Sequence, residues 1–270
     1  RIYEAGYKTI TIENMNQTQG LGTVSFSLAH NKVLERADRQ RVATQLVLIM
    51  KESLSRKNFE GIKILDIGCS SGVITQFIAR QGGTVVGIDV DKNAIKMAAN
   101  DSKDLKNLSF KLASGITLPF RNNSFDIVLC NQVYSFISNP SKMIKEIYRV
   151  LRMEGFCLFT GDNLLNPIET MYGLPFLRWL PKEFSKGILK IMGCKDLYIG
   201  NYKTYWGLLK LCSDFGIDDY TLKVLKQPEK FKFKKILKYR KVINLIPYPF
   251  LKFLEPLLPT FIFILKKVKY

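Results

Sequence analysis

The stretch Ile62-Lys-Ile-Leu-Asp-Ile-Gly-Cys-Ser-Ser-Gly72 decides the fold of this 270-residue chain. It begins as a short, apolar, β-branched run, which favours a buried strand. A turn rich in glycine and serine follows, and from Val73 apolar residues recur at helical spacing as far as the stop signal Gly82-Gly83. A strand, a tight turn and a helix in this order form the first half of a βαβ unit, which binds ligands at the carboxyl end of its strand.

The turn also indicates the kind of ligand. A dinucleotide fingerprint, G-x-G-x-x-G, has three glycines that let the backbone approach a pyrophosphate. This turn has only Gly68 and Gly72, and Asp66 stands two residues before the first of them. A carboxylate is unfavourable beside a pyrophosphate and favourable beside an ammonium group. S-adenosylmethionine carries an ammonium and a sulfonium but no phosphate, so it fits this turn better than a nicotinamide cofactor. A tight turn that binds no ligand is the structural alternative.

Three segments resemble the class I S-adenosylmethionine-dependent methyltransferases. The segment Leu65–Gly72 resembles their first motif, although the family usually has a third glycine where Ser70 stands. The Leu-Pro-Phe turn at Leu118, followed by a strand that ends in Asn131-Gln132, resembles a later family segment. A helix, a glycine and a strand then follow over 139–161. The resemblance covers about residues 62 to 162 and is closest to the ubiquinone/menaquinone-biosynthesis-like branch.

The resemblance implies an α/β fold, with a Rossmann-like seven-stranded sheet that ends in an antiparallel hairpin. We expect an N-terminal helical cover over 1–57, with one helix from Leu28 to Lys57, and a cofactor-binding core over 58–162. A cap insertion over 163–203 precedes the completion of the core over 204–270. Strands are expected at Ile217–Leu225 and Thr260–Lys269, with a basic amphipathic insertion over 226–259 between them.

A second acid supports the cofactor assignment. Asp89 ends the next predicted strand 23 residues after Asp66, close to the spacing expected for an acid that binds the ribose. The resemblance places Val90 against the adenine, residues 114–116 near its amino group, and the end of the fourth strand near the methionine part. The expected cofactor-binding residues are Asp66, Gly68, Cys69, Ser70, Gly72, Asp89, Val90, Ser114, Gly115, Ile116, Asn131 and Gln132.

The catalytic base is left unassigned. Methyl transfer from a sulfonium is an in-line displacement in which the protein mainly positions the reactants and sometimes supplies a base. Members near the quinone-biosynthesis branch often have histidines after the fourth strand, where this chain has Ser135 and Phe136. His30, the one histidine, and Tyr134 are weak candidates, since a lone histidine is more often structural. The sequence has no metal-spaced histidine and cysteine cluster, so we expect no metal.

Charge and composition indicate possible partners. The net charge is +18, and residues 221–270 hold 13 Lys and Arg against two acids, Glu229 and Glu255. Lysines beside aromatic and aliphatic residues over 226–259 suit an interfacial membrane segment as well as a plain lid. Four prolines between Leu245 and Leu265 disfavour a membrane-spanning helix. The five cysteines form no C-x-x-C pair, which favours a reducing cytoplasm, with peripheral placement on the inner membrane face as an option.

The predicted function is methyl transfer from S-adenosylmethionine to a small-molecule or lipid-linked acceptor, such as a quinone precursor. One alternative is an RNA methyltransferase that uses the basic C-terminal region on phosphates. The other is a non-catalytic protein of the same fold that binds a membrane or a partner. Because the Asn-Pro-Pro-Tyr type signature is absent after the fourth strand, methylation of nucleic-acid amino groups is disfavoured.

Overall fold

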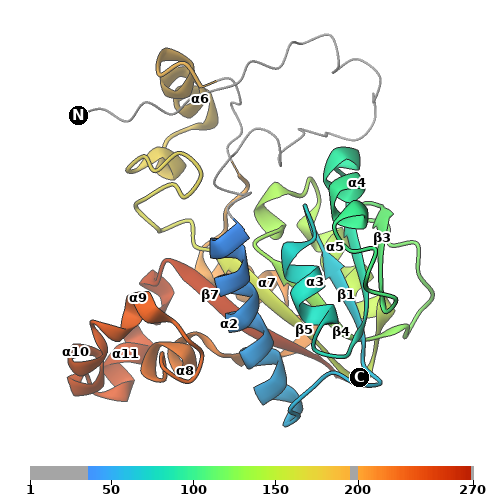
Figure 1. Cartoon of the computed structure of the whole chain (residues 1–270). Coiled ribbons are helices and arrows are strands. Elements are labelled where there is room, and N and C mark those ends of the chain that lie inside the picture. The colour runs from blue at the N-terminus through green and yellow to red at the C-terminus, as the bar shows by residue number, and fades with distance from the viewer. Residues whose placement is uncertain (1–35, 195–199, 269–270) are drawn as a thin grey trace.

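The computed structural model describes residues 36–194 and 200–268 and contains a mixed, seven-stranded sheet in the order β3-β2-β1-β4-β5-β7-β6 (Figure 1). The first five strands in this order, from β3 across to β5, pair in parallel, and β7 lies antiparallel between β5 and β6. This is the predicted Rossmann-like sheet with its terminal antiparallel hairpin, so the fold prediction is confirmed. The strands are β1 Lys63–Ile67, β2 Thr84–Asp89, β3 Leu108–Leu112, β4 Phe125–Asn131, β5 Leu151–Asp162, β6 Phe215–Asp219 and β7 Thr260–Lys267.

Helices cover both faces of the sheet because successive residues of each buried strand point to opposite sides. On β7, Phe261 and Phe263 join the core cluster that α5 and α7 cover, whereas Ile262 joins the cluster that α2 and α3 cover. The helices of the core are α2 Arg36–Leu54, α3 Val73–Ala79, α4 Lys92–Asn100, α5 Pro140–Val150 and α7 Tyr205–Leu211, with the 3₁₀ turn η3 Tyr134–Phe136.

Local sequence sets where these helices begin. The Asp91 carboxylate accepts hydrogen bonds from the backbone N–H groups of Asn93 and Ala94, which caps α4. Asn139 caps α5 in the same way, with Pro140 as its first residue. These side chains satisfy N–H groups that the first helical turn leaves without partners, and the start of α5 agrees with the helix expected from residue 139.

Two segments are inserted around this core. The cap follows β5 and contains η4 Leu177–Trp179 and α6 Lys182–Ile191. The second insertion separates β6 from β7, and its helices α8 to α11 gather on one side of the molecule, in orange and red (Figure 1). It consists of α8 Thr221–Lys226, α9 Lys234–Leu237, α10 Arg240–Leu245, α11 Tyr248–Leu254 and η5 Glu255–Leu257.

One predicted strand is wrong in its second half. The sequence analysis expected a strand over Ile217–Leu225, but β6 ends at Asp219 and Thr221 begins α8. The hydroxyl Oγ1 of Thr221 accepts the hydrogen bond from the Ile262 backbone N–H, so a side chain replaces the next rung of the ladder with β7. The apolar residues Leu222 and Val224, whose alternation suggested a strand, are instead buried in a helix.

The predicted N-terminal helix is described only from Arg36 to Leu54, and its expected first residues lie outside the described part of the chain. Cys69, Cys130, Cys157 and Cys212 are free thiols, and Cys130 and Cys157 are buried in β4 and β5 as small core residues. Among the described helices, none combines the length and the apolar character needed to cross a bilayer.

Candidate cofactor site

The turn after β1 is built around two glycines that no other residue can replace without strain. Gly68 and Gly72 have φ angles of +72° and +75°, in the left-handed region. A Cβ on Gly68 would lie 2.6 Å from Val133 Cγ2, and one on Gly72 would lie 2.6 Å from Phe110 Cζ. The backbone N–H groups of Gly68 and the buried Cys69 both donate to the Ile88 carbonyl, at 2.9 and 3.0 Å. These contacts hold the turn against the end of β2.

Ser70 occupies the place where the family usually has its third glycine. Its φ angle is +50°, so the backbone there adopts the conformation that favours glycine. The Ser70 backbone N–H donates to Asp89 Oδ2 at 2.8 Å. Among the described residues, the buried Ser70 hydroxyl has no hydrogen-bond partner. The departure from the family pattern therefore leaves the turn intact and adds a polar group that a ligand can satisfy.

Asp89 connects the two strands that form the site. Its Oδ1 accepts from the Asp91 backbone N–H at 2.9 Å, while Oδ2 accepts from Ser70. Partial burial raises the pKa of the Asp89 carboxyl, and these two backbone N–H groups oppose that shift. Each carboxylate oxygen keeps lone pairs for further donors. The neighbouring Val90 is exposed.

Asp66 lies beneath the turn and is almost completely buried. Its Oδ2 accepts a hydrogen bond from Thr75 Oγ1 at 2.7 Å. Burial raises the pKa of Asp66 to about 7, the Thr75 hydrogen bond and the positive charge of Arg39 oppose this shift, and the charge of Asp89 adds to it. A cationic group bound above the turn would favour the ionised form.

Arg39 is a site residue that the sequence analysis did not identify. It lies in the first turns of α2, and the carboxylates of Asp66 and Asp89 both act on its charge. Burial lowers the pKa of the Arg39 guanidinium, and these two carboxylates oppose the shift. Only the packing of α2 against the sheet brings this cation to the turn, so no local pattern in the sequence marks it.

Residues 114–116 lie beside the same strand ends. The Ala113 backbone N–H donates to the Asp89 carbonyl at 3.0 Å, and the Ile116 backbone N–H donates to Ser114 Oγ at 3.4 Å. A Cβ on the buried Gly115 would lie 3.0 Å from Ile67 Cγ2, at the end of β1. The structure therefore brings this segment close to Asp89.

The end of β4 forms the other side of the site. Asn131 Oδ1 accepts from Thr160 Oγ1 at 2.7 Å, and the Gln132 backbone N–H donates to the Thr160 carbonyl at 3.1 Å. Gln132 has a φ angle of +60°, a left-handed conformation that costs energy outside glycine and is held here by neighbouring contacts.

Of the two weak catalytic candidates, Tyr134 and His30, the structure describes only Tyr134. Tyr134 is fully buried, and its hydroxyl donates to the Asp162 carbonyl at 2.5 Å and accepts from the Lys203 backbone N–H at 3.0 Å. Burial raises the pKa of this hydroxyl. These contacts assign Tyr134 a structural role between η3 and the cap rather than that of a base. His30 lies outside the described residues.

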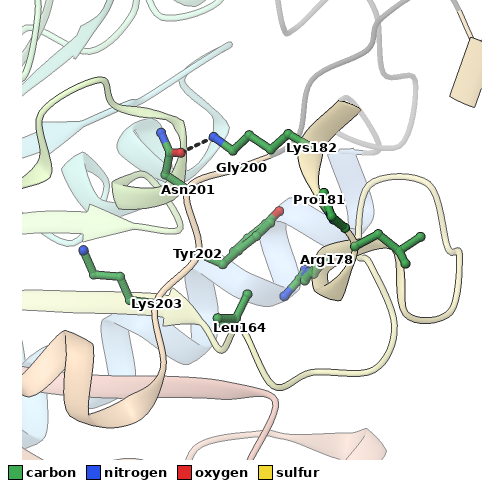
Figure 2. Close-up of a pocket in the computed structure, with 9 residues that line it drawn as sticks. Leu164, Arg178, Pro181, Lys182, Gly200, Asn201, Tyr202 and Lys203 are labelled. Carbon is green, nitrogen blue, oxygen red and sulfur yellow. Dashed lines mark hydrogen bonds between the residues drawn. The ribbon is translucent and has the colours of Figure 1, made fainter. Parts of the chain in front are cut away.

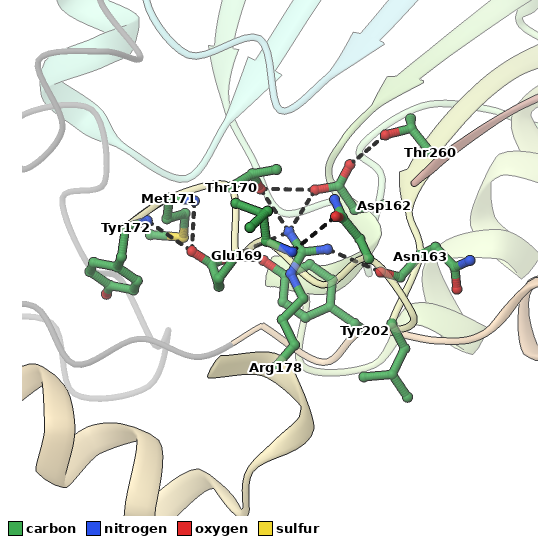
Figure 3. Close-up of polar contacts among 12 residues, drawn as sticks. Asp162, Asn163, Glu169, Thr170, Met171, Tyr172, Arg178, Tyr202 and Thr260 are labelled. Atoms are coloured by element: carbon green, nitrogen blue, oxygen red, sulfur yellow. Dashed lines mark hydrogen bonds and ion pairs between the residues drawn. The ribbon is translucent and has the colours of Figure 1, made fainter. Parts of the chain in front are cut away.

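A buried arginine joins the cap to the end of β5 (Figure 3). The Arg178 side chain is fully buried and donates to Asp162 Oδ2 at 2.9 Å, with Glu169 Oε1 at 3.6 Å. Its guanidinium carbon lies 3.9 Å from the centre of the Tyr202 ring. Because breaking a buried ion pair leaves uncompensated charge, this network holds the cap in one position.

A hollow opens beside this network (Figure 2). In the view, Tyr202 lies between Arg178 and the hydrogen bond that joins Lys182 to Asn201. The Asn201 backbone N–H donates to the Ser135 carbonyl at 2.8 Å, which places the wall of the hollow next to η3 and therefore near the end of β4. The lining combines aliphatic and basic side chains, from Leu164, Arg178, Leu180, Pro181, Lys182, Gly200, Asn201, Tyr202 and Lys203.

The residues at the turn fit S-adenosylmethionine. Half-buried Asp89 offers acceptors, the Ser70 hydroxyl lacks a partner, and the two glycines keep side chains out of the turn. In the described part of the chain, no group of three metal-ligating side chains is assembled.

Comparison with known proteins agrees with this geometry. Residues 65–159 match the family of the methyltransferase domain. The mitochondrial ubiquinone biosynthesis O-methyltransferase of Arabidopsis thaliana is 31% identical over 138 residues, which cover 49% of this chain and 43% of that protein. The ubiquinone biosynthesis O-methyltransferase of Bartonella bacilliformis is 27% identical, over 62% of this chain and 67% of that protein. The chain spans about half the length of most of the curated relatives it matches.

Two solved structures share the fold. The YcgJ protein of Bacillus subtilis superposes with a TM-score of 0.53 at 16% identity, over 84% of this chain and 99% of that one. The PH0226 protein of Pyrococcus horikoshii gives 0.51 at 16% identity, over 85% and 91%. The domain match supports the predicted cofactor, S-adenosylmethionine. The resemblance predicted from the sequence is thereby confirmed: residues 65–159 match the methyltransferase domain family, and the chain has the class I fold and resembles the O-methyltransferases of ubiquinone biosynthesis.

Proposed function

We propose that this protein transfers a methyl group from S-adenosylmethionine to a small-molecule or lipid-linked acceptor. The observation that carries the proposal is the turn at Gly68–Gly72, held by the Asp89 carboxylate, with the Ser70 hydroxyl buried and unpartnered among the described residues. S-adenosylmethionine, when bound, supplies an electrophilic methyl group, so the protein has to bind and orient the two reactants.

The chain's residues divide this work by position. Asp89 binds the ribose hydroxyls, for which its carboxylate oxygens retain lone pairs. Val90 and residues 114–116 flank the adenine, and Asn131 and Gln132 border the methionine part. Arg39 adds a partly buried cation near Asp66 that suits the methionine carboxylate.

An oxygen of a quinone precursor is the proposed acceptor. Two relatives named above are ubiquinone biosynthesis O-methyltransferases, and the hollow beside η3 combines apolar walls with Lys182 and Lys203. Aliphatic walls suit a prenyl chain or ring, and the ammonium groups suit an anionic or phenolic oxygen. His30 stays a candidate base from the sequence, while Tyr134 is left out because its hydroxyl contacts are already made with the backbone.

The proposed organisation of the chain follows the same division. Residues 1–57 cover the cofactor site, 58–162 bind the cofactor, 163–203 cap the acceptor, and 204–270 complete the sheet. The basic insertion over 226–259 is proposed to place the protein on the cytoplasmic face of a membrane, where a lipid-linked acceptor is available. An RNA acceptor is the competing outcome, and it predicts binding that weakens steeply with salt.

Calorimetric titration with S-adenosylhomocysteine tests the cofactor site. We expect micromolar binding to the wild type and a loss of about 10- to 100-fold in Asp89→Ala, because hydrogen bonds to a charged group contribute about 1.5–3 kcal/mol. Asp89→Asn keeps one acceptor oxygen, so its affinity is expected to lie between those of the wild type and Asp89→Ala.

Asp91→Ala is the matched control, because it removes a capping carboxylate only two residues away. It is expected to lower stability and leave the affinity within about threefold, since a lost cap costs about 1 kcal/mol of folding free energy. A folded wild type that binds no S-adenosylhomocysteine would contradict the enzyme assignment.

A further inference from the structure

The insertion between β6 and β7 contains a stretch without any buried residue, in which the half-buried Phe233 packs against the core. Phe231 and Leu251 are buried, but none of residues 232–250 between them is. Two whole helices, α9 and α10, have no buried residue. Short helices are unstable alone in water, and amphipathic helices in proteins usually bury their apolar side. We call residues 232–257 the docking surface.

Large apolar side chains project from this surface into solvent. On α10, Val242 is 61% exposed and Leu245 83%, three residues apart on the same side of the helix. On α11, Phe253 is 75% exposed, and its ring lies 6.4 Å from that of Phe250, centre to centre. The other exposed apolar residues here are Tyr239, Tyr248 and Leu257. A concentration of this kind marks an interaction site.

The segment that carries these apolar side chains is also strongly basic. The docking surface contains seven Lys and Arg and one acid, Glu255. Arg240 pairs with Glu229, and Lys252 pairs with Glu255. The remaining lysines form no ion pair with any described acid, and they are Lys232, Lys234, Lys235, Lys238 and Lys241. Their charge is therefore available to an anionic partner.

The core holds both ends of the docking surface. At its start, Gln45 Nε2 of α2 donates to the Lys232 carbonyl at 3.2 Å, and the adjoining Phe231 packs edge-on to Tyr220 with ring centres 6.5 Å apart. At its end, the buried Glu255 accepts from the Tyr205 hydroxyl at 3.3 Å. The exposed apolar side chains are thus presented on a supported scaffold.

The same end meets the cap. Asn163, the first residue after β5, donates through Nδ2 to the carbonyls of Pro256 and Leu258 at 2.8 and 2.9 Å. The cap also begins there, and Arg178 donates to the Asn163 carbonyl at 3.0 Å. The end of the docking surface at Pro256 is therefore joined to the base of the cap that we propose covers the acceptor.

We propose that the docking surface binds the anionic surface of a lipid bilayer, with the side chains around Leu245 and Phe253 in the interfacial layer and the free lysines on lipid phosphates. This deepens the proposed function, on which it rests only for the idea that the acceptor is lipid-linked. Transfer from water into the interfacial layer of a bilayer is favourable for the aliphatic side chains of Val242 and Leu245, but these side chains cannot stack on the bases of RNA. A second copy is disfavoured because two such basic surfaces would repel each other.

Vesicle flotation tests the proposal with the full chain. We expect binding to vesicles of phosphatidylcholine with phosphatidylglycerol, little binding to phosphatidylcholine alone, and weakening with salt, because each lysine near an anionic surface contributes about 1 kcal/mol. The variants Leu245→Ser/Phe253→Ser and Lys234→Glu/Lys235→Glu are each expected to lower the partition coefficient by at least about tenfold.

Matched controls lie elsewhere on the surface. Met97→Ser/Met153→Ser removes exposed apolar side chains, and Lys92→Glu/Lys96→Glu reverses exposed charges on α4. Both should float like the wild type. Equal flotation of the docking variants, equal binding to neutral vesicles, or binding only to RNA would each overturn the proposal. Titration with S-adenosylhomocysteine separates the membrane hypothesis from the methyltransferase hypothesis, because the docking variants should keep the wild-type affinity for this ligand. If the wild type failed to bind S-adenosylhomocysteine, the flotation result would still test the membrane hypothesis.

Discussion

The turn at Gly68–Gly72 and the docking surface at 232–257 obey opposite constraints. In the turn, a single added methyl group would collide with the core, and both glycines have left-handed backbones. Over 232–250, no side chain is buried and Phe233 is the residue that packs against the core, so the fold places few constraints on this stretch. Cofactor binding requires a particular backbone, whereas contact with a lipid surface requires only apolar and basic side chains in the right place. Substitutions in the turn should therefore lower the stability of the fold, whereas substitutions on the docking surface should lower membrane binding and leave the stability nearly unchanged.

The largest effect is expected from Gly72→Ala. The new Cβ would meet Phe110 and Ala98 at 2.6 and 2.8 Å, and the backbone would keep a φ of +75°. Overpacking and left-handed strain together predict a loss of about 3 kcal/mol in the free energy of unfolding, measured with urea.

Gly173→Ala is the control, because it has a similar φ of +69° with nothing within 4 Å of its Cβ. It carries the backbone strain alone, so it should cost about 1 kcal/mol. Equal losses in the free energy of unfolding for Gly72→Ala and Gly173→Ala would mean that the close packing around Gly72 adds nothing to the cost of the substitution.

A smaller effect, dependent on pH, is expected at Asp66. Because burial raises the pKa of Asp66 to about 7, the folded protein binds this proton more tightly than the unfolded chain does. The stability that this group contributes is present below the unfolded pKa of about 4 and is lost as the pH rises through about 7. Asp66→Asn, which keeps an acceptor for Thr75, should lack this decline.

Urea unfolding of both proteins between about pH 5 and pH 8 measures the difference. The stability of the wild type should fall relative to that of Asp66→Asn as the pH rises. Parallel curves would show that Asp66 titrates at an ordinary pKa in the folded state.

A gain in stability is expected from Ser70→Gly. The change relieves a non-glycine residue at a φ of +50° and removes a buried hydroxyl without a partner among the described residues. It should raise the free energy of unfolding by about 0.5 kcal/mol, since the greater freedom of glycine in the unfolded chain offsets part of the relief. A weaker affinity for S-adenosylhomocysteine at unchanged or higher stability would place the hydroxyl on the cofactor, whereas a loss of stability would contradict the strain argument.

The smallest effect on stability is expected from Leu245→Ser/Phe253→Ser. Because both side chains are mostly exposed, the free energy of unfolding should change by less than about 0.5 kcal/mol, even though flotation with anionic vesicles is lost. Thermal unfolding in the absence of vesicles checks this. A large loss would mean that the docking surface is part of the core in solution, and it would remove the contrast with the glycine turn.

Much of the fold followed from local patterns. The strand, turn and helix around Gly68, the acid at Asp89 and the caps at Asp91 and Asn139 each depend on residues close in sequence, so they were predictable. The stretch Ile217–Leu225 was misjudged because its apolar alternation fits a strand, whereas the Thr221 side chain ends the ladder by bonding to Ile262. Such competition between a side chain and a neighbouring strand is not visible in a single segment.

By itself, the sequence determined the cofactor turn and the basic, apolar character of the docking surface, because these depend on backbone geometry and on composition. Only the tertiary structure decided that the charge of Arg39 comes under the influence of Asp66, that Tyr134 bridges backbone groups, and that Arg178 joins the cap to β5. The physical reason is that each of these contacts joins residues from separate elements, and a contact between elements forms only after the sheet has brought them together.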